Sequence, residues 1–454
     1  MVETLVITDR IRVCFSGHGE GAGEMSWGQQ AIWRVMQESR SSIIQGLASP
    51  APPGFTAEDM AAELRFIMNR YPTMRTRLRF EADGTTRQVV EAEGEIAIEV
   101  ADVDSGEDPA EVAAAIRDRY TRTVFDYANE WPVRIALVRR DGVLSHVVRA
   151  FCHLASDGMG FARMAADVFH PDRAALPAPT AVDALDQARW QRTAAGLQQS
   201  NNALRYWESL LRTIPARRFP APVDDANTRG RWQVEFVSPA MHLAIPAVAA
   251  RVGIPTSSIL LTAFVLSLSR VTGADPVVTK VLVSNRFRAS LAKTVSPIAQ
   301  HGLLVVDVNG ASFDEALTRT QRVAMRTYKH AYYDPERLRE LMARVSQERG
   351  EQIDLACLYN DRRTNAEQVT VAAPTEADIH AILPDTSLRW AFPTPNLNEK
   401  LLIIINDKPT TIAITAMVDT DHLTPNRTEA LLRGMEETIV AAFDSPARAP
   451  ASRL

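Results

Sequence analysis

One stretch of this sequence, residues 151–158, carries residue types that could perform proton-transfer chemistry. It reads Phe-Cys-His-Leu-Ala-Ser-Asp-Gly, so His153 stands four residues before Asp157, and Gly158 follows directly. Histidine ionises near neutrality, so it can accept or donate a proton in a reaction at physiological pH. Glycine lets the backbone approach a neighbouring group closely. The spacing predicts a turn that holds His153 firmly while the imidazole faces a cavity.

A second interpretation of the same residues involves no chemistry. Ser156 or Asp157 could cap the helix expected to follow, since both side chains accept hydrogen bonds from the free N–H groups at a helix start. His153 would then be a core histidine with satisfied hydrogen bonds. The residues alone leave both interpretations open.

Hydrophobic periodicity predicts the strands and the helix on either side of this stretch. Strands are expected at residues 133–138 and 143–152, joined by Asp141-Gly142, a strong signal for a two-residue hairpin turn. A helix is expected at residues 159–169. His153 and Asp157 should therefore lie between the end of a strand and the start of a helix.

The rest of the chain alternates between helical and strand-like patterns. Residues 57–70 are expected to form a helix that Thr56 caps, with Asp59 three residues on. The glycine-rich residues 17–23 predict a flexible loop. Further helices are expected at 25–44, 109–124, 184–211, 239–252, 257–271, 313–328 and 425–443, and further strands at 76–80, 88–91, 96–103, 277–283, 303–308, 401–405 and 411–418. This mixture predicts an α+β fold. The Pro- and Ala-rich residues 171–180 predict a linker, and thus domains at 1–175 and 176–454.

Composition narrows the functional class. The chain has 454 residues, of which 46% are hydrophobic and 23% charged, and its formal net charge is −5. That balance is typical of a globular protein and offers no basic surface for nucleic acid or anionic membranes. Three scattered cysteines, Cys14, Cys152 and Cys357, form no CxxC pair, so a disulfide framework and a zinc cluster are not expected. We expect a cytoplasmic protein without a bound metal.

Five more segments occur in an order that resembles a known family. They are Ser26, Gln29 and Trp33; Arg70, Arg75 and Thr76; Tyr206-Trp207; Asn285-Arg286-Phe287-Arg288; and residues 330–335, His-Ala-Tyr-Tyr-Asp-Pro. Together with the stretch that ends in Asp157-Gly158, they resemble the motifs of nonribosomal-peptide condensation domains, in the superfamily that includes chloramphenicol acetyltransferase. The resemblance runs from residue 25 to about residue 335.

Two departures from the family pattern stand out. Cys152 replaces the first histidine of the family's H-H-x-x-x-D-G motif, although acyltransferase relatives carry H-x-x-x-D-G alone. Residues 298–306, Ile-Ala-Gln-His-Gly-Leu-Leu-Val-Val, replace a segment that usually reads I-G-x-F-V-N-T-L. Since side chains alternate along a strand, Cys152 should face the interior if His153 faces a channel. A buried cysteine behaves as a small hydrophobic residue, so Cys152 is predicted to be inert.

The resemblance implies two chloramphenicol-acetyltransferase-like lobes in a V, a pseudo-dimer with a substrate tunnel between them. It implies a stand-alone, monomeric acyltransferase of nonribosomal-peptide or polyketide biosynthesis, which joins a thioester-bound donor to an amine or hydroxyl acceptor. The donor would ride on the phosphopantetheine of a carrier protein or on coenzyme A, with no permanently bound cofactor. His153 would handle the proton, Asp157 would pair with Arg286, and a backbone N–H near Gly158 would face the oxyanion.

Two other functions are compatible with the same motifs. The altered Cys152 and residues 298–306 favour a degenerate fold that binds a carrier or synthetase partner without catalysis. Epimerisation of a tethered aminoacyl thioester is the other, because epimerisation domains share the motif.

Overall fold

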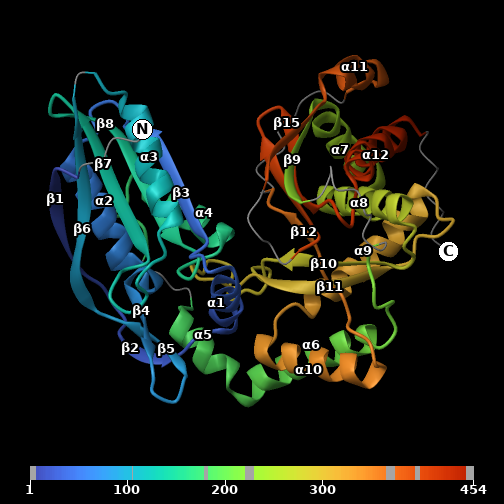
Figure 1. Cartoon of the computed structure of the whole chain (residues 1–454), viewed down its shortest axis with the longest axis horizontal. Helices are drawn as coiled ribbons and strands as arrows, with labels where there is room; N and C mark the ends of the chain where they lie inside the picture. Colours follow the sequence, from blue (N-terminus) through green and yellow to red (C-terminus); the bar gives the residue numbers. More distant parts are fainter. Residues whose placement is uncertain are drawn as a thin grey trace. The chain divides into compact units, whose positions relative to one another are not determined.

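The computed structural model describes residues 7–104, 106–177, 182–219, 230–363, 374–393 and 399–445. Contacts divide the chain into two compact units (Figure 1): residues 1–200 with 284–300, and residues 201–283 with 301–454. This division differs from the expected boundary at residue 175. Helix α5 (Ala184–Gln191) packs on α1 (Trp27–Ser39) and on β2 (Gly21–Glu24), and residues 284–300 return to the first unit. Each unit combines helices with sheets, so the α+β class is confirmed.

The first unit holds two sheets. The larger has the strand order β1-β6-β7-β8-β3, and the smaller has the order β2-β5-β4. Its remaining elements are β1 (Asp9–Ser16), β3 (Ile44–Pro50), α2 (Ala57–Arg70), the 3-10 turn η1 (Pro72–Arg75), β4 (Thr76–Phe80), β5 (Thr86–Val90), β6 (Glu93–Val103), α3 (Pro109–Arg122), β7 (Val133–Arg140), β8 (Val143–Cys152), α4 (Gly158–Val168) and the start of α6 (Ala194–Leu211).

Helices cover both faces of the larger sheet. Ile135 and Leu137 of β7 belong to a core cluster with residues of α2 and α4. Their chain neighbours Ala136 and Val138 point the opposite way, into a cluster with residues of α3. This alternation of period two buries both faces of β7, and of β8 beside it. The strand that ends at Cys152 therefore has buried side chains on both of its faces.

The second unit is built on one seven-stranded sheet of order β11-β10-β12-β14-β15-β9-β13. Strand β12 pairs in parallel with β10 and β14, whereas β15 pairs antiparallel with β14 and β9. Its elements, besides the rest of α6, are β9 (Arg231–Ser238), α7 (Pro239–Val252), α8 (Thr256–Thr272), β10 (Val277–Val283), β11 (Gln300–Val306), α9 (Phe313–Lys329), α10 (Pro335–Arg349), β12 (Cys357–Asp361), α11 (Glu376–Ile382), the 3-10 turn η2 (Leu383–Asp385), β13 (Ser387–Pro393), β14 (Leu401–Lys408), β15 (Thr411–Asp419) and α12 (Pro425–Asp444).

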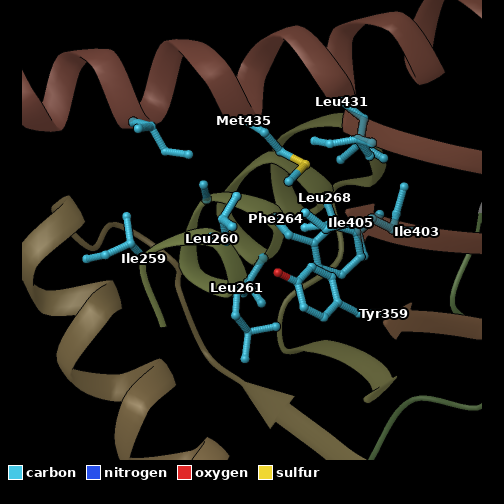
Figure 2. Close-up of a cluster of buried hydrophobic side chains, with 14 of the residues drawn as sticks. Ile259, Leu260, Leu261, Phe264, Leu268, Tyr359, Ile403, Ile405, Leu431 and Met435 are labelled. Atoms are coloured by element: carbon cyan, nitrogen blue, oxygen red, sulfur yellow. The ribbon is translucent and has the colours of Figure 1, made fainter. Parts of the chain in front are cut away.

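The core of this unit lies between the sheet and helices α8 and α12. Leu260 and Phe264 of α8 are fully buried, as are Ile403 of β14 and Met435 of α12. Figure 2 shows these side chains around the ring of Tyr359, whose centroid is 5.0 Å from that of Phe264. Burial of large apolar side chains stabilises a fold by roughly 1.5–3 kcal/mol each, so this cluster anchors the unit.

Local signals for the start of a helix and for a hairpin are confirmed. Thr56 caps α2 in a capping box with Asp59. Asp141 and Gly142 adopt φ values of 52° and 75°, as a two-residue hairpin with two positive φ angles requires.

Three expectations were wrong. The helix expected at residues 25–44 ends at Ser39, because Arg40 takes a left-handed φ of 51°. The single helix expected at 184–211 is broken into α5 and α6, and the hydroxyl of Thr193 accepts a bond from Gly196 N at the start of α6. Part of the expected glycine-rich loop forms strand β2.

Among the described residues, no single helix is both long enough and apolar enough to cross a membrane; α7 and α8, bent by 109°, meet that test only as a pair. Residues 178–180 of the expected linker lie outside the described residues.

Candidate active site

His153 is the first residue after β8 and is half-buried. The turn that carries it is closed by a hydrogen bond of 3.0 Å from Ala155 N to Cys152 O. Asp157 then caps α4, because its Oδ1 accepts a bond of 2.9 Å from Gly160 N. The capping interpretation is thus correct for Asp157. Only five residues, 153–157, separate the strand from the helix, so the position of His153 is set at both ends.

Asp157 forms a buried ion pair with Arg286. Arg286 Nη2 lies 2.7 Å from Oδ1 of Asp157, and Nη1 donates to Oδ2 at 3.0 Å. The side chain of Arg286 is 10% exposed, and that of Asp157 is 7% exposed. A planar guanidinium holds a carboxylate by two parallel hydrogen bonds in this way. The pairing that the family resemblance implies is therefore present.

The same carboxylate also holds the backbone of residues 284–300. Oδ2 of Asp157 accepts bonds of 3.0 Å from both Ile298 N and Ala299 N. Arg286 Nη2 donates to Thr294 O at 3.0 Å. A buried carboxylate costs free energy unless its oxygens are satisfied, and these contacts satisfy both oxygens. Asp157 is thus a structural centre that ties the turn after β8 to a segment more than a hundred residues away.

Two glycines in the turn have different roles. A Cβ at position 160 would lie 2.0 Å from Ser156 Oγ and 3.0 Å from Arg286 Nη2. A Cβ at Gly158 would meet no described atom within 4 Å. Gly160, which the motif comparison missed, is therefore the glycine that makes room for the ion pair. Gly158 is exposed at the first turn of α4, where free backbone N–H groups can face an anion.

The opening motif has a structural explanation. Ser26 and Gln29 form the capping box of α1, and Gln29 also donates to Gln88 Oε1 at 3.1 Å. A Cβ at Gly28 would lie only 1.8 Å from Pro297 O. Helix α1 therefore packs directly on the backbone of the segment that Asp157 holds.

The second motif is also structural. Arg75 is fully buried, and its guanidinium donates to the carbonyl oxygens of Met68, Gly19, His18 and Glu91. Burial lowers the pKa of this guanidinium. Thr76 donates to Pro72 O at 2.8 Å. Arg70, the third matched residue, pairs with Asp167 of α4 at 3.0 Å. These residues fix the loops beside the candidate site and are not free to bind a substrate.

Cys152 faces the interior, as predicted. Its side chain is fully buried, and its Sγ donates to Ser42 O at 3.6 Å. Burial raises the pKa of the thiol to about 12. The neutral thiol is a poor nucleophile, so a covalent role for Cys152 is disfavoured.

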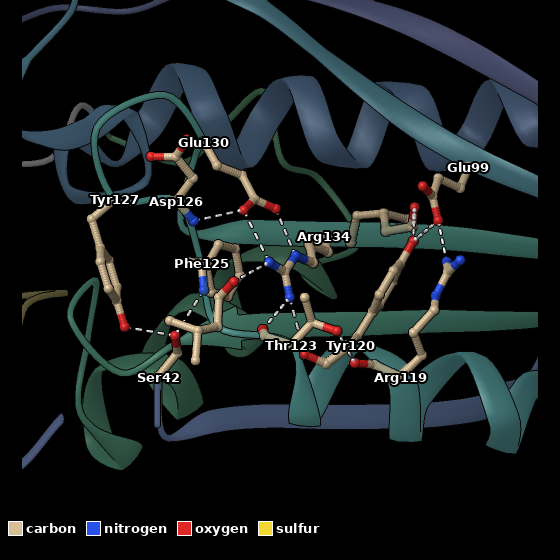
Figure 3. A network of polar contacts seen from close by, with 12 residues as sticks. Ser42, Glu99, Arg119, Tyr120, Thr123, Phe125, Asp126, Tyr127, Glu130 and Arg134 are labelled. Atoms are coloured by element: carbon tan, nitrogen blue, oxygen red, sulfur yellow. Dashed lines mark hydrogen bonds and ion pairs between the residues drawn. The ribbon is translucent and has the colours of Figure 1, made fainter. Parts of the chain in front are cut away.

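A polar network supports the wall beside Cys152 (Figure 3). Ser42 Oγ accepts a bond of 2.9 Å from Phe125 N and is 2.6 Å from the hydroxyl of Tyr127. Arg134 lies over the ring of Phe125, 3.8 Å from its centroid, and forms an ion pair with Glu130. These contacts hold residues 123–134 in place.

Two motif segments meet in the second unit. The ring of Trp207 is buried edge-on against Tyr333, with centroids 5.7 Å apart. The ring of Tyr206 stacks on His330 at 4.6 Å. The Tyr-Trp dipeptide and residues 330–335 therefore form one packed cluster between α6, α9 and α10.

His301 and the exposed set Glu376, His380 and Asp444 carry ionisable groups outside the turn of His153. Desolvation lowers the pKa of His301 to about 3, and the nearby charge of Lys280 adds to this shift. The imidazole is therefore uncharged at neutral pH. Within the described ranges, one group of side chains could hold a metal ion: Glu376, His380 and Asp444, all exposed. His380 Nε2 lies 3.1 Å from Asp444 Oδ2, so an ordinary surface contact explains the group.

The chain is similar to several known proteins. The sequence profile described as "Condensation domain" matches residues 25–382. An isonitrile lipopeptide synthase of Mycobacterium tuberculosis is 26% identical over 354 residues, which cover 71% of this chain and 14% of that protein. Cyclosporin synthetase of Tolypocladium inflatum is 24% identical over 336 residues, 70% of this chain and 2% of that protein. The chain thus spans a small part of the curated relatives it matches.

Solved structures share the fold. The condensation domain of the Monacolin K polyketide synthase aligns with a TM-score of 0.72 and 14% identity, over 95% of this chain and 99% of that one. A structure described as the molecular basis for condensation domain-mediated chain release from the enacyloxin polyketide synthase aligns with a TM-score of 0.70 and 18% identity. The alignment covers 100% of this chain and 87% of that one. The epimerization domain of tyrocidine synthetase B aligns with a TM-score of 0.71 and 15% identity, over 94% and 98%.

Proposed function

This chain belongs to the condensation-domain family, and from that premise we propose that it is an acyltransferase. It transfers an acyl or aminoacyl group from a thioester to an amine or hydroxyl acceptor in the synthesis of a specialised metabolite. The observation that carries the proposal is the five N–H bonds to Asp157, which fix the turn that begins at His153. A site this constrained has the preorganisation that acid–base catalysis requires.

The proposed reaction is a direct transfer. His153 accepts the proton of the acceptor as its nitrogen or oxygen attacks the thioester carbonyl. The new carbon–nitrogen or carbon–oxygen bond forms, the carbon–sulfur bond breaks, and the proton passes from the imidazole to the departing thiolate. A backbone N–H at Gly158, at the start of α4, stabilises the oxyanion that develops. Asp157 and Arg286 are positioning residues.

The donor sulfur belongs to a pantetheine arm, on either a carrier protein or coenzyme A. No step uses the thiol of Cys152, because it is buried and its pKa is raised to about 12. Holding both substrates in line then supplies much of the rate, since the reaction has no acyl-enzyme stage.

Product analysis by mass spectrometry tests the proposal. The protein is incubated with acyl-pantetheine and acyl-carrier thioesters and a panel of amines and alcohols. We expect an amide or ester that depends on the protein. If no donor and acceptor give a product while the carrier still binds, a non-catalytic binding role is favoured. Cys152, at the position of the first motif histidine, favours the same alternative.

Epimerisation gives a different result in the same experiment. With an aminoacyl thioester in deuterated water and no acceptor, an epimerase incorporates deuterium at the α-carbon. An acyltransferase leaves that carbon protonated. Deuterium incorporation without condensation would overturn the proposed activity.

A further inference from the structure

Helix α9 presents a one-sided basic surface. Residues 318–329 contain the cations Arg319, Arg322, Arg326 and Lys329 and no acidic residue, in a chain whose net charge is −5. All four are exposed, whereas Thr320, Ala324 and Thr327 are buried on the opposite side of the helix. Positions three and four apart lie on one face of a helix. We call the exposed set Arg322, Met325, Arg326 and Lys329 the α9 face.

The arginines of this face differ from those of the neighbouring helix. On α10, Arg339 pairs with Glu336, and Arg344 pairs with Glu208. Arg319, at the N-terminal side of the α9 face, is 3.7 Å from Asp307. Among the described residues, no carboxylate forms an ion pair with Arg322 or Arg326. Two cations one turn apart thus remain available to an external anion.

An exposed apolar side chain lies between these cations. Met325 is 65% exposed, although it lies on a helix whose other side is well packed. Arginine and methionine are enriched at protein–protein interfaces relative to the rest of a protein surface. The composition of the α9 face is therefore that of an interface with an acidic partner rather than of a purely solvated helix.

Helix α9 packs on the strand that follows the segment held by Asp157. Ala299, which donates to Asp157, is followed by Gln300 at the start of β11. Two residues later, Gly302 packs against α9, since a Cβ there would lie 2.4 Å from Thr327 Cγ2. The C-terminal half of α9 is therefore fastened to the strand that continues from the segment held by Asp157.

We infer that the α9 face docks the carrier protein that delivers the thioester donor. This inference rests on the proposed function, which requires a donor on a pantetheine arm. In the carrier-bound form, a phosphodiester joins that arm to the carrier, so an anion lies at the carrier surface. Arginine binds phosphate and carboxylate oxygens well. Arg322 and Arg326 contact acidic groups of the carrier or its phosphodiester, and Met325 packs against its apolar side chains.

The test measures binding of carrier domains separately from catalysis. Acidic carrier domains that bear phosphopantetheine are labelled with a fluorophore, and their affinity is measured by anisotropy for the wild type, for Arg322→Glu/Arg326→Glu and for Met325→Ala. We expect the double reversal to weaken binding by about tenfold or more, because it places like charges opposite each other. Added salt should weaken wild-type binding as well. Arg433→Glu, a reversal of an exposed arginine on α12, is the matched control and should not change the affinity.

Transfer from a short acyl-pantetheine thioester separates this inference from the proposed function. The double variant should keep the wild-type rate with the short donor and lose rate only with the carrier-bound donor. Equal carrier affinity for wild type and double variant, equal loss in Arg433→Glu, or no binding of any carrier by the wild type would overturn the docking assignment. Failure of the wild type with the short donor, alongside normal carrier binding, would count against the proposed activity alone.

Discussion

Cys152 illustrates how strand geometry decides reactivity at the scale of one residue. Its thiol is buried with a pKa raised to about 12, while Cys14 is exposed. Alkylation requires the thiolate, which a neutral buried thiol hardly forms below pH 9. We predict that iodoacetamide modifies Cys14 in the folded protein and leaves Cys152 unmodified, as peptide mass spectrometry would show. Rapid labelling of Cys152 under native conditions would be inconsistent with this structure.

The ion pair of Asp157 and Arg286 should behave as one unit. Removing either partner leaves a buried charge, which typically costs ~3–5 kcal/mol of folding free energy. We expect Asp157→Ala and Arg286→Ala each to lower stability strongly, and the double variant to lose much less than the sum. Urea denaturation of the four proteins gives the coupling energy. Strictly additive losses would mean that the two side chains do not interact.

The structure and the motif differ on which of the two turn glycines, Gly158 or Gly160, matters more for stability. The motif emphasises Gly158, yet a Cβ there meets no described atom within 4 Å, whereas a Cβ at Gly160 meets Ser156 and Arg286. We predict that Gly160→Ala destabilises the protein by about 1–3 kcal/mol, the usual cost of overpacking. Gly158→Ala should change stability far less. Thermal melts compare the two; the opposite order would show that the turn has another geometry.

At the scale of elements, α1 is placed by one close backbone contact. A Cβ at Gly28 would lie 1.8 Å from Pro297 O, and a backbone carbonyl cannot rotate away as a side chain can. We predict that Gly28→Ala displaces residues 294–299 and lowers both stability and transfer. Gly106→Ala, where no described atom lies within 4 Å, is the control. A melting temperature and transfer rate equal to those of the wild type would count against this packing.

Elements with local signals were predictable from the sequence. The box of Thr56 and Asp59 starts α2, and Asp141-Gly142 turns the hairpin from β7 to β8. Strand β3 was not predicted, because the helical pattern was expected to continue to residue 44. The helix ends at Arg40 in a left-handed conformation, and no glycine or proline there indicates the end. Strands β1, β9, β12 and β13 and helices α10 and α11 were also not anticipated.

The candidate site was predictable only in part. His153, Asp157 and Arg286 were found from motif residues that lie far apart in the sequence. Gly28 and Gly160 were not, because their importance depends on which backbone or side-chain atoms come close in the folded chain. Likewise, the burial of Arg75 among four carbonyl groups is a tertiary property that no spacing reveals.

At the scale of the whole molecule, the chain crosses between its two units more than once. Residues 284–300 belong to the first unit although they follow β10 of the second. We predict that Asp157→Ala increases amide hydrogen exchange at residues 152–160 and 294–299, since Ile298 N and Ala299 N lose their acceptor. Exchange in α8 and β14, in the separate core of the second unit, should stay unchanged. A uniform increase across both units would instead indicate one cooperative structure.

The proposed acyl transfer depends most on His153, the group that handles the proton. The direct measurement is the rate of acyl transfer by wild type and His153→Ala, with one acyl-pantetheine thioester and one accepted amine, after melting curves establish that the variant is folded. General acid–base catalysis contributes about 10²- to 10⁴-fold, so we predict a loss of that size at an unchanged melting temperature. A folded His153→Ala variant that transfers at nearly the wild-type rate would contradict the assignment.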